Sequence, residues 1–301
     1  MALKIVEFFG FRPDDPHIEA ANARKSSLCP FVGTQCAKTL SDGQLSGACT
    51  VRQTKPESII CCPKRMYANS YLILRDIAAS VFGSDLEFRL GNSPAPAEPA
   101  TRVYAFGSSV GGEIKLPPVS GRGGFFVDWI LALVNARGGL EDFVAVEVQS
   151  IDTTGNYRGE RDAYLNGAGF EGYSKGGINW ENVNKRILPQ LIYKGHVLRR
   201  ESLCTKGLYF ICPTPVYRRI ERRIGGTLTK YRPSQGTLTF RWYDIEPKAP
   251  AGAARQLKFE GELTTTVEQV AYAFLSPGNM PPENSYAAAV RAKLHSIGIG
   301  G

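Results

Sequence analysis

The middle of the sequence, residues 127–150, holds two apolar runs joined by a glycine-rich turn, and this feature constrains the fold most. Residues 129–134 and residues 143–149 are apolar along most of their length, as expected of buried strands. Gly138 and Gly139 between them are typical of a turn. The pattern therefore predicts a β-hairpin inside a hydrophobic core.

Polar residues lie at one end of this predicted hairpin. Asp128 precedes the first run, and Glu147 and Gln149 end the second. Because side chains alternate along a strand, Glu147 and Gln149 share a face. If the hairpin is symmetric about Gly138 and Gly139, Asp128 falls opposite Gln149. Two carboxylates beside apolar surface repel each other and are poorly solvated, and Mg²⁺ would relieve both costs. The alternative is that these residues only begin and end strands at a solvated edge.

Length and composition exclude several classes of protein. The 301 residues, 43% of them hydrophobic, suit one large domain or two modest ones. No apolar run is long enough to span a bilayer, and residues 1–7 lack the pattern of a signal peptide. We therefore expect a cytoplasmic protein without a membrane partner. No phosphate-binding P-loop, nucleophile elbow or Cys-His arrangement is present.

Positive charge is concentrated in one part of the chain. Residues 181–232 contain twelve Lys or Arg and three Glu, a local excess of nine charges against +8 for the whole chain. A predicted helix at residues 217–224 carries Arg218, Arg219, Arg222 and Arg223. This concentration favours a nucleic acid surface, and the alternative is a well-solvated helix face.

Five of the seven cysteines lie between residues 29 and 62. They are Cys29, Cys36, Cys49, Cys61 and Cys62. Four thiolates in a tetrahedral arrangement bind zinc or iron, and such a metal would supply folding free energy that a segment with few large apolar residues lacks. The alternative is a set of buried or reactive thiols, and the pattern does not choose between Cys61 and Cys62. Of the other two cysteines, Cys212 is predicted to be a core thiol in a strand, and Cys204 has no interpretation.

The remaining pattern predicts helices and a boundary. Helices are expected at residues 69–82 and 182–200. A stretch rich in Pro and Ala at residues 92–99 is the best candidate linker. The chain is therefore divided into an N-terminal region with the cysteines, residues 1–90, and a second domain, residues 91–301.

Several short blocks of the sequence occur together and in a fixed order. They are Glu7-Phe8-Phe9-Gly10, Cys29-Pro30-Phe31, Cys62-Pro63 with Arg65, Gly111-Gly112-Glu113, Asp128-Trp129, Glu147 with Gln149, and Asp152, Gly155 and Tyr157. In these blocks the chain resembles the NotI type of restriction endonuclease, a branch of the PD-(D/E)xK nucleases. The resemblance spans most of the chain.

The resemblance implies an α/β fold with a mixed sheet flanked by helices, in which the hairpin forms the catalytic edge. It implies Mg²⁺-dependent, site-specific hydrolysis of double-stranded DNA by a type II restriction endonuclease, at a long GC-rich palindrome. Asp128 and Glu147 would hold Mg²⁺, Glu113 would be a further active-site acid, and Gln149 stands where most PD-(D/E)xK nucleases have Lys. Because Gln149 replaces this Lys, the resemblance does not identify the residue or group that acts as the general base.

The resemblance also implies a structural metal and an assembly. Cys29, Cys36, Cys49 and Cys62 would hold iron or zinc, with Cys61 as the extra thiol. Cutting both strands of a palindrome implies a two-fold homodimer. The alternative function is a sequence-specific DNA-binding protein with a structural metal and an inactive nuclease site, because Gln149 lacks the charge of Lys.

Overall fold

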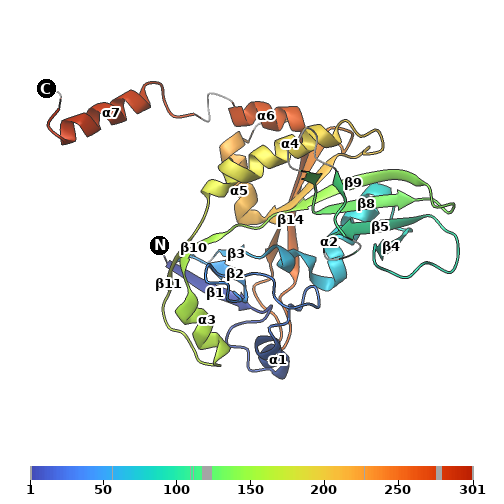
Figure 1. Cartoon of the computed structure of the whole chain (residues 1–301), viewed down its shortest axis with the longest axis horizontal. Helices are drawn as coiled ribbons and strands as arrows, with labels where there is room; N and C mark the ends of the chain where they lie inside the picture. The colour runs from blue at the N-terminus through green and yellow to red at the C-terminus, as the bar shows by residue number, and fades with distance from the viewer. Residues whose placement is uncertain are drawn as a thin grey trace.

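The structure is a computed structural model that describes residues 2–55, 57–108, 110, 112–116, 124–226, 228–275 and 280–299 (Figure 1). Gly111 of the Gly-Gly-Glu block lies outside the described residues.

A mixed seven-stranded sheet forms the centre of the described part of the chain. The predicted hairpin contributes two adjacent antiparallel strands, and β9, β12 and β13 run parallel to one another. The order of strands across the sheet is β14 (Leu257–Thr266), β13 (Thr237–Ile245), β12 (Leu208–Pro213), β9 (Leu140–Val148), β8 (Trp129–Val134), β5 (Arg102–Gly107) and β4 (Glu87–Leu90).

Helices cover both faces of this sheet, since each of the two largest hydrophobic clusters combines strand and helix residues. On one face, helix α2 (Ala68–Phe82) packs Leu74 and Ile77 against alternate residues of β9 such as Val146. On the other face, the residues of β9 that point the opposite way meet α4 and α5. The expected mixed α/β sheet flanked by helices is therefore confirmed. The helices on the face opposite α2 are α4 (Leu188–Leu198), α5 (Thr214–Ile224) and α6 (Val267–Leu275).

A second, antiparallel sheet of five strands lies beside the first within the described residues. Both sheets contain strands from either side of the expected boundary between residues 90 and 91, and the division into two domains stays a prediction. The strand order is β10 (Thr153–Asn156), β11 (Ser174–Ile178), β1 (Ala2–Phe8), β2 (Ala48–Arg52) and β3 (Ser58–Ile60).

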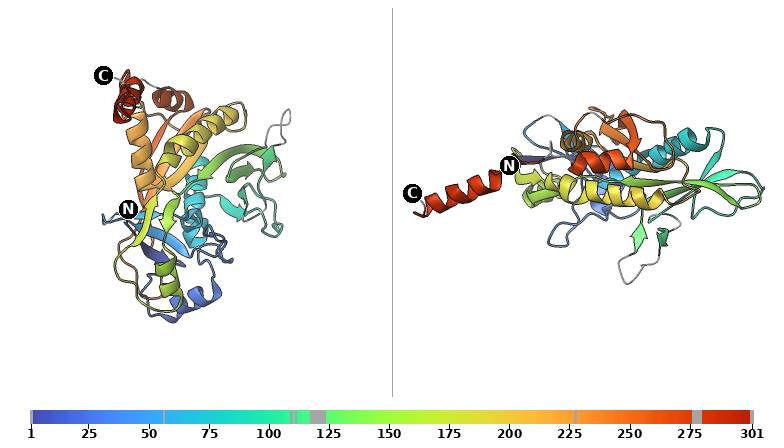
Figure 2. Two further views of the ribbon diagram at one scale, coloured as in Figure 1. Left: turned by 60° about the vertical axis from the view of Figure 1, so that its left-hand side comes forward. Right: turned by 90° about the horizontal axis from the view of Figure 1, so that it is seen from above.

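The remaining elements are short or peripheral. They are α1 (Ile18–Ser26), the 3₁₀ helix η1 (Pro63–Tyr67), β6 (Lys115–Leu116), β7 (Phe125–Phe126), α3 (Arg158–Leu165), the π-helix η2 (Val183–Ile187) and α7 (Ser285–Ser296). Helix α7 buries none of its residues and projects from the body of the molecule (Figure 2). Among the described residues, no helix has the length and apolar character needed to cross a membrane.

The predicted helices are confirmed, with corrections at their ends. The helix predicted at residues 182–200 consists of the π-helix η2 followed directly by α4, with Pro189 near their junction. In α2, Asn69 and its next two neighbours have left-handed φ angles of 55–60°. The Asn69 side chain donates a hydrogen bond to Gln256.

Candidate active site and cysteine cavity

The register of the β8–β9 hairpin brings the two predicted carboxylates together. Trp129 pairs with Val146, so the next step of the same register places Asp128 opposite Glu147. The expectation that Asp128 lies opposite Gln149 is wrong. Val134 pairs with Leu140, so the turn is centred on Arg137 and not between Gly138 and Gly139. A bulge between Leu133 and Val134 then shifts the register by one residue.

Asp128 and Glu147 are in contact across the two strands. The backbone N–H of Val148 donates to Oδ2 of Asp128 at 2.8 Å, and the Asp128 N–H lies 3.4 Å from Oε2 of Glu147. Glu147 is 7% exposed and Asp128 is half-buried. Burial and the nearby Asp128 charge raise the pKa of Glu147 to about 7, and burial raises the pKa of Asp128 as well. The pair is therefore a site where an added cation would be favoured.

A lysine from α4, which sequence reasoning missed, completes this cluster. Nζ of Lys194 donates to Oε1 of Glu147 at 2.6 Å, and the ammonium lies 5.3 Å from the ring centroid of Phe126. The charge of Lys194 lowers the pKa of both carboxyl groups against the effect of burial. In the sequence, Lys194 was counted only as one charge of the basic segment. The signal that could have found it is its helical spacing from Leu191 and Leu198, which places a lysine on the buried side of the predicted helix.

The two other predicted catalytic residues lie at the edge of the cluster. The Gln149 backbone N–H donates to the carbonyl of Ile211 on β12 at 2.9 Å, and its side-chain amide lies 3.3 Å from the carbonyl of Ser150. The carboxylate of Glu113 forms an ion pair with Lys115 at 3.3 Å, and its charge raises the pKa of Asp128. Glu113 therefore acts electrostatically on Asp128.

Helix η1 supports the active-site strand from the other face of the sheet. The Trp129 indole N–H donates to the Tyr67 hydroxyl at 3.0 Å, and burial followed by the Asp128 charge raises the pKa of Tyr67. Lys64 lies 5.4 Å from the Tyr67 ring centroid, and its charge lowers the pKa of Asp128. Because η1 begins directly after Cys62, the cysteine segment is joined to the active site by one turn of helix.

A small cavity of about 20 Å³ lies in the cysteine segment. It is lined, among others, by Cys29, Cys36, Cys49 and Cys62. Burial raises the pKa of the Cys62 thiol to about 11 and also raises that of Cys29 and Cys49. The extra thiol, Cys61, points elsewhere and lies 3.6 and 3.5 Å from the carbonyls of Ala48 and Cys49.

The donor set of this cavity suits a soft metal ion. Four thiols enclose a volume that has room for one small ion, and thiolates prefer zinc or iron. Within the described residues, however, no group of three or more His, Cys, Asp or Glu side chains is placed to hold a metal ion. The four thiols share a cavity without the geometry of a formed centre.

Three of the sequence blocks meet beside this cavity. The Arg65 guanidinium bonds both carboxylate oxygens of Glu7, at 2.9 and 3.1 Å, and lies 4.6 Å from the ring centroid of Phe31. Gly10 has a φ angle of +86°, and a Cβ there would lie 2.4 Å from Cγ of Pro30. These contacts explain why a glycine and an ion pair occur at these positions.

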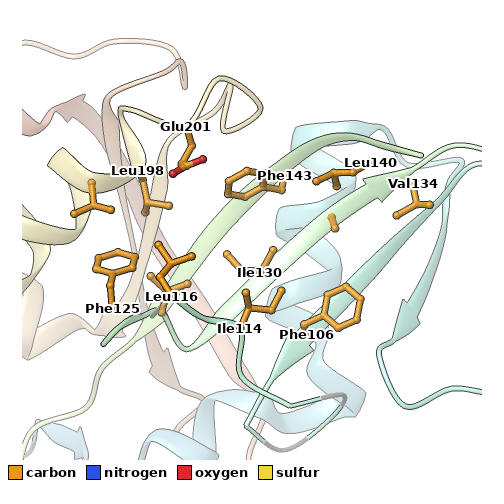
Figure 3. A pocket seen from close by; sticks show the side chains of 13 residues that line it. Phe106, Ile114, Leu116, Phe125, Ile130, Val134, Leu140, Phe143, Leu198 and Glu201 are labelled. Atoms are coloured by element: carbon orange, nitrogen blue, oxygen red, sulfur yellow. The ribbon is translucent and has the colours of Figure 1, made fainter. Parts of the chain in front are cut away.

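An apolar cavity of about 330 Å³ lies beside the hairpin on its α4 side (Figure 3). Phe125, Ile130, Phe143 and Leu198 point into it, and Glu201 lies at its border. Among the residues that line it, Glu201 is the one acid, and Asp128 and Glu147 are not part of its lining.

The basic helix has the predicted apolar side and the predicted charged side. Helix α5 buries Tyr217, Ile220 and Ile224 and exposes Arg218 and Arg222. Arg218 forms an ion pair with Glu57 at 2.6 Å, and the guanidinium of Arg222 bonds the carbonyl of Arg218. The solvent side of α5 therefore carries Arg218, Arg219 and Arg222 together with Glu221, and Arg218 is paired with Glu57. The two cysteines outside the N-terminal segment, Cys204 and Cys212, are both fully buried.

Comparison with known proteins identifies the family. None of the curated proteins that were compared matches the chain. The family described as "Restriction endonuclease NotI" matches residues 11–206, which is more than half of the 301 residues. The matched segment contains the carboxylate pair, Gln149 and the four cysteines of the small cavity. This chain belongs to the NotI restriction endonuclease family.

Proposed function

We propose that this protein is a type II restriction endonuclease that hydrolyses phosphodiester bonds of double-stranded DNA at a specific site with Mg²⁺. The observation that carries the proposal is the pairing of Asp128 with Glu147 on neighbouring strands in a chain of this family. The resemblance adds a PD-(D/E)xK type of nuclease core and a long GC-rich palindrome as the recognition site.

Each side chain of the site has a role that follows from its chemistry. Asp128 and Glu147 would hold Mg²⁺, since hard carboxylate oxygens are its preferred protein ligands. When bound, Mg²⁺ supplies a Lewis acid for the phosphate and lowers the pKa of a water. Gln149 would orient that water through its amide without adding charge, and Glu113 would hold water at the border of the site.

The DNA surface and the assembly follow from charge and symmetry. The exposed arginines of α5 would contact phosphates of the DNA backbone. A palindrome presents two equivalent phosphodiesters, so a two-fold homodimer would place one active site on each strand. Sedimentation of the protein alone and with DNA measures this stoichiometry.

We also propose a structural iron or zinc ion held by Cys29, Cys36, Cys49 and Cys62, because these four thiols line one cavity. Metal binding would release the thiol protons that burial retains in the metal-free protein. Helix η1 directly follows Cys62 and carries Lys64 and Tyr67. A metal bound to Cys62 would therefore hold η1 in position, and with it the hydrogen bond from Trp129 to Tyr67.

The test is incubation of the purified protein with large unmethylated DNA of known sequence and Mg²⁺, with EDTA as the control. Discrete metal-dependent fragments are expected, and their ends would give the recognition site. A smear would contradict site specificity. Tight binding without cutting would favour the alternative, a sequence-specific DNA-binding protein in which the uncharged Gln149 leaves the site inactive.

A further inference from the structure

The strongest unexplained feature is the lysine that α4 inserts beside the carboxylate pair. The side chains of Lys194 and Glu147 are only 13% and 9% exposed, and their charged atoms lie 2.6 Å apart. A buried ammonium is costly unless it is paired, and even a paired one often contributes little net stability. A residue with this cost on the apolar side of α4 indicates a role in chemistry.

The balance of charge at the site points to that role. Asp128 and Glu147 bring two negative charges, and Gln149 at the end of β9 brings none. Lys194 neutralises one of the two, so a net negative charge remains to attract a divalent cation. The ammonium has three N–H donors, and its bond to Glu147 uses one of them.

We propose that Lys194 is a catalytic residue that supplies, from α4, the positive charge that Gln149 does not bring. This inference rests on the proposed nuclease function. In the hydrolysis, a water oxygen bonds to phosphorus, the bond from phosphorus to one bridging oxygen breaks, the water loses a proton and the leaving oxygen gains one. Negative charge accumulates on the non-bridging oxygens, and the ammonium of Lys194 stabilises that charge.

The same geometry predicts a second effect. Without DNA, the ammonium of Lys194 occupies Oε1 of Glu147 and competes with any cation for that oxygen. Removing the ammonium should therefore tighten the binding of a divalent cation to the DNA-free protein while it slows cleavage. A lysine with only a structural role would not move these two quantities in opposite directions.

The experiment compares Lys194→Met and Lys194→Arg with the wild type. Cleavage of a duplex containing the mapped site is measured at saturating DNA with Mg²⁺, and Ca²⁺ binding to the DNA-free protein is measured by calorimetry. We expect Lys194→Met to lower kcat at least roughly a hundredfold with unchanged DNA affinity in Ca²⁺. We expect its Ca²⁺ affinity to rise roughly tenfold. Lys194→Arg keeps the charge and should recover most of kcat.

A matched control is Lys258→Met, since Lys258 pairs with Glu260 on the exposed part of β14, outside the basic segment. If Lys194→Met cuts like Lys258→Met, the inference is overturned and the proposed function stands. If Lys194→Met does not fold, a failure of Lys194→Arg to cut would overturn the inference. If the wild type does not cut either, the proposed function fails. In that case an unchanged Ca²⁺ affinity in Lys194→Met would also overturn the inference that the Lys194 ammonium competes with a cation for Glu147.

Discussion

Arg65 and Glu7 form an ion pair in which both side chains are completely buried, with Nε and Oε2 2.9 Å apart. The pair joins the first strand of the chain to helix η1, which carries Lys64 and Tyr67 toward the active-site strand. Thr50 donates a further hydrogen bond to Glu7, so the carboxylate is held by partners from two other segments, β2 and η1. The cysteine segment and the catalytic strand are therefore mechanically connected through this pair.

Removal of one partner of this pair should be strongly destabilising. Arg65→Met leaves the Glu7 carboxylate buried without its counter-ion, and we expect a loss of about 3–5 kcal/mol in the free energy of unfolding. The double variant Glu7→Gln with Arg65→Met should lose less, because no uncompensated charge remains. Urea unfolding measures both, and equal losses would show that the charge is not the cause.

Loss of either active-site carboxylate should abolish cleavage and spare DNA binding. Asp128→Asn and Glu147→Ala each remove a charged oxygen ligand, and we expect cleavage to fall by more than about a hundredfold. Binding to the mapped site in Ca²⁺ should persist. Glu141→Gln, at an exposed position of the same strand, is the control and should cut normally. Cleavage by the Asp128 or Glu147 variants would refute the site assignment.

The stability of the metal-free protein should fall as the pH rises through the titration range of Glu147. The pKa of this carboxyl is raised from its ordinary value of 4.5 to about 7, so the folded state holds a proton that the unfolded state has released between these values. Raising the pH across this window therefore disfavours folding, by up to roughly 3 kcal/mol for this group.

Glu147→Gln isolates this contribution. Urea unfolding in EDTA at pH 4.5, 5.5 and 7.5 should show the wild type losing stability relative to the variant as the pH rises. Added Mg²⁺ should reverse the loss, because a cation prefers the ionised carboxylate. Parallel pH curves for the two proteins would contradict the raised pKa of Glu147.

The cysteine cavity should bind one metal ion per chain. Elemental analysis of clean protein should find stoichiometric iron or zinc, and replacing Cys29, Cys36, Cys49 and Cys62 by Ser should remove it and lower the melting temperature. Cys61→Ser is the matched control, because Cys61 does not line the cavity. A metal-free wild type, or metal loss in the Cys61 variant, would reject the four-cysteine assignment.

Charge on α5 should set the salt dependence of DNA binding. Arg218→Glu and Arg222→Glu each replace an exposed positive charge, so we expect weaker binding and a salt slope reduced by about one for each lost phosphate contact. Lys25→Glu changes the net charge equally on the distant α1 and should leave the slope unchanged. If all three variants had the same salt slope, the α5 arginines would contribute to solubility and not to DNA binding.

The local pattern of the sequence determined the elements and the identity of the acids. Apolar runs around a glycine turn are enough to predict β8 and β9, because strand alternation and turn preference are short-range effects. The same reasoning found α5, whose apolar positions recur at helical spacing. The cysteine cluster could also be predicted, since five cysteines lie close together in the sequence itself.

Only the tertiary structure decided which side chains meet. The turn is centred on Arg137, and the bulge between Leu133 and Val134 then sets the register that places Asp128 opposite Glu147. The expected symmetry about Gly138 and Gly139 missed both features. Lys194 joins Glu147 across 47 residues of sequence, because parallel pairing of β12 with β9 carries α4 onto that face of the sheet. Such contacts depend on packing between distant segments, and no local periodicity encodes them.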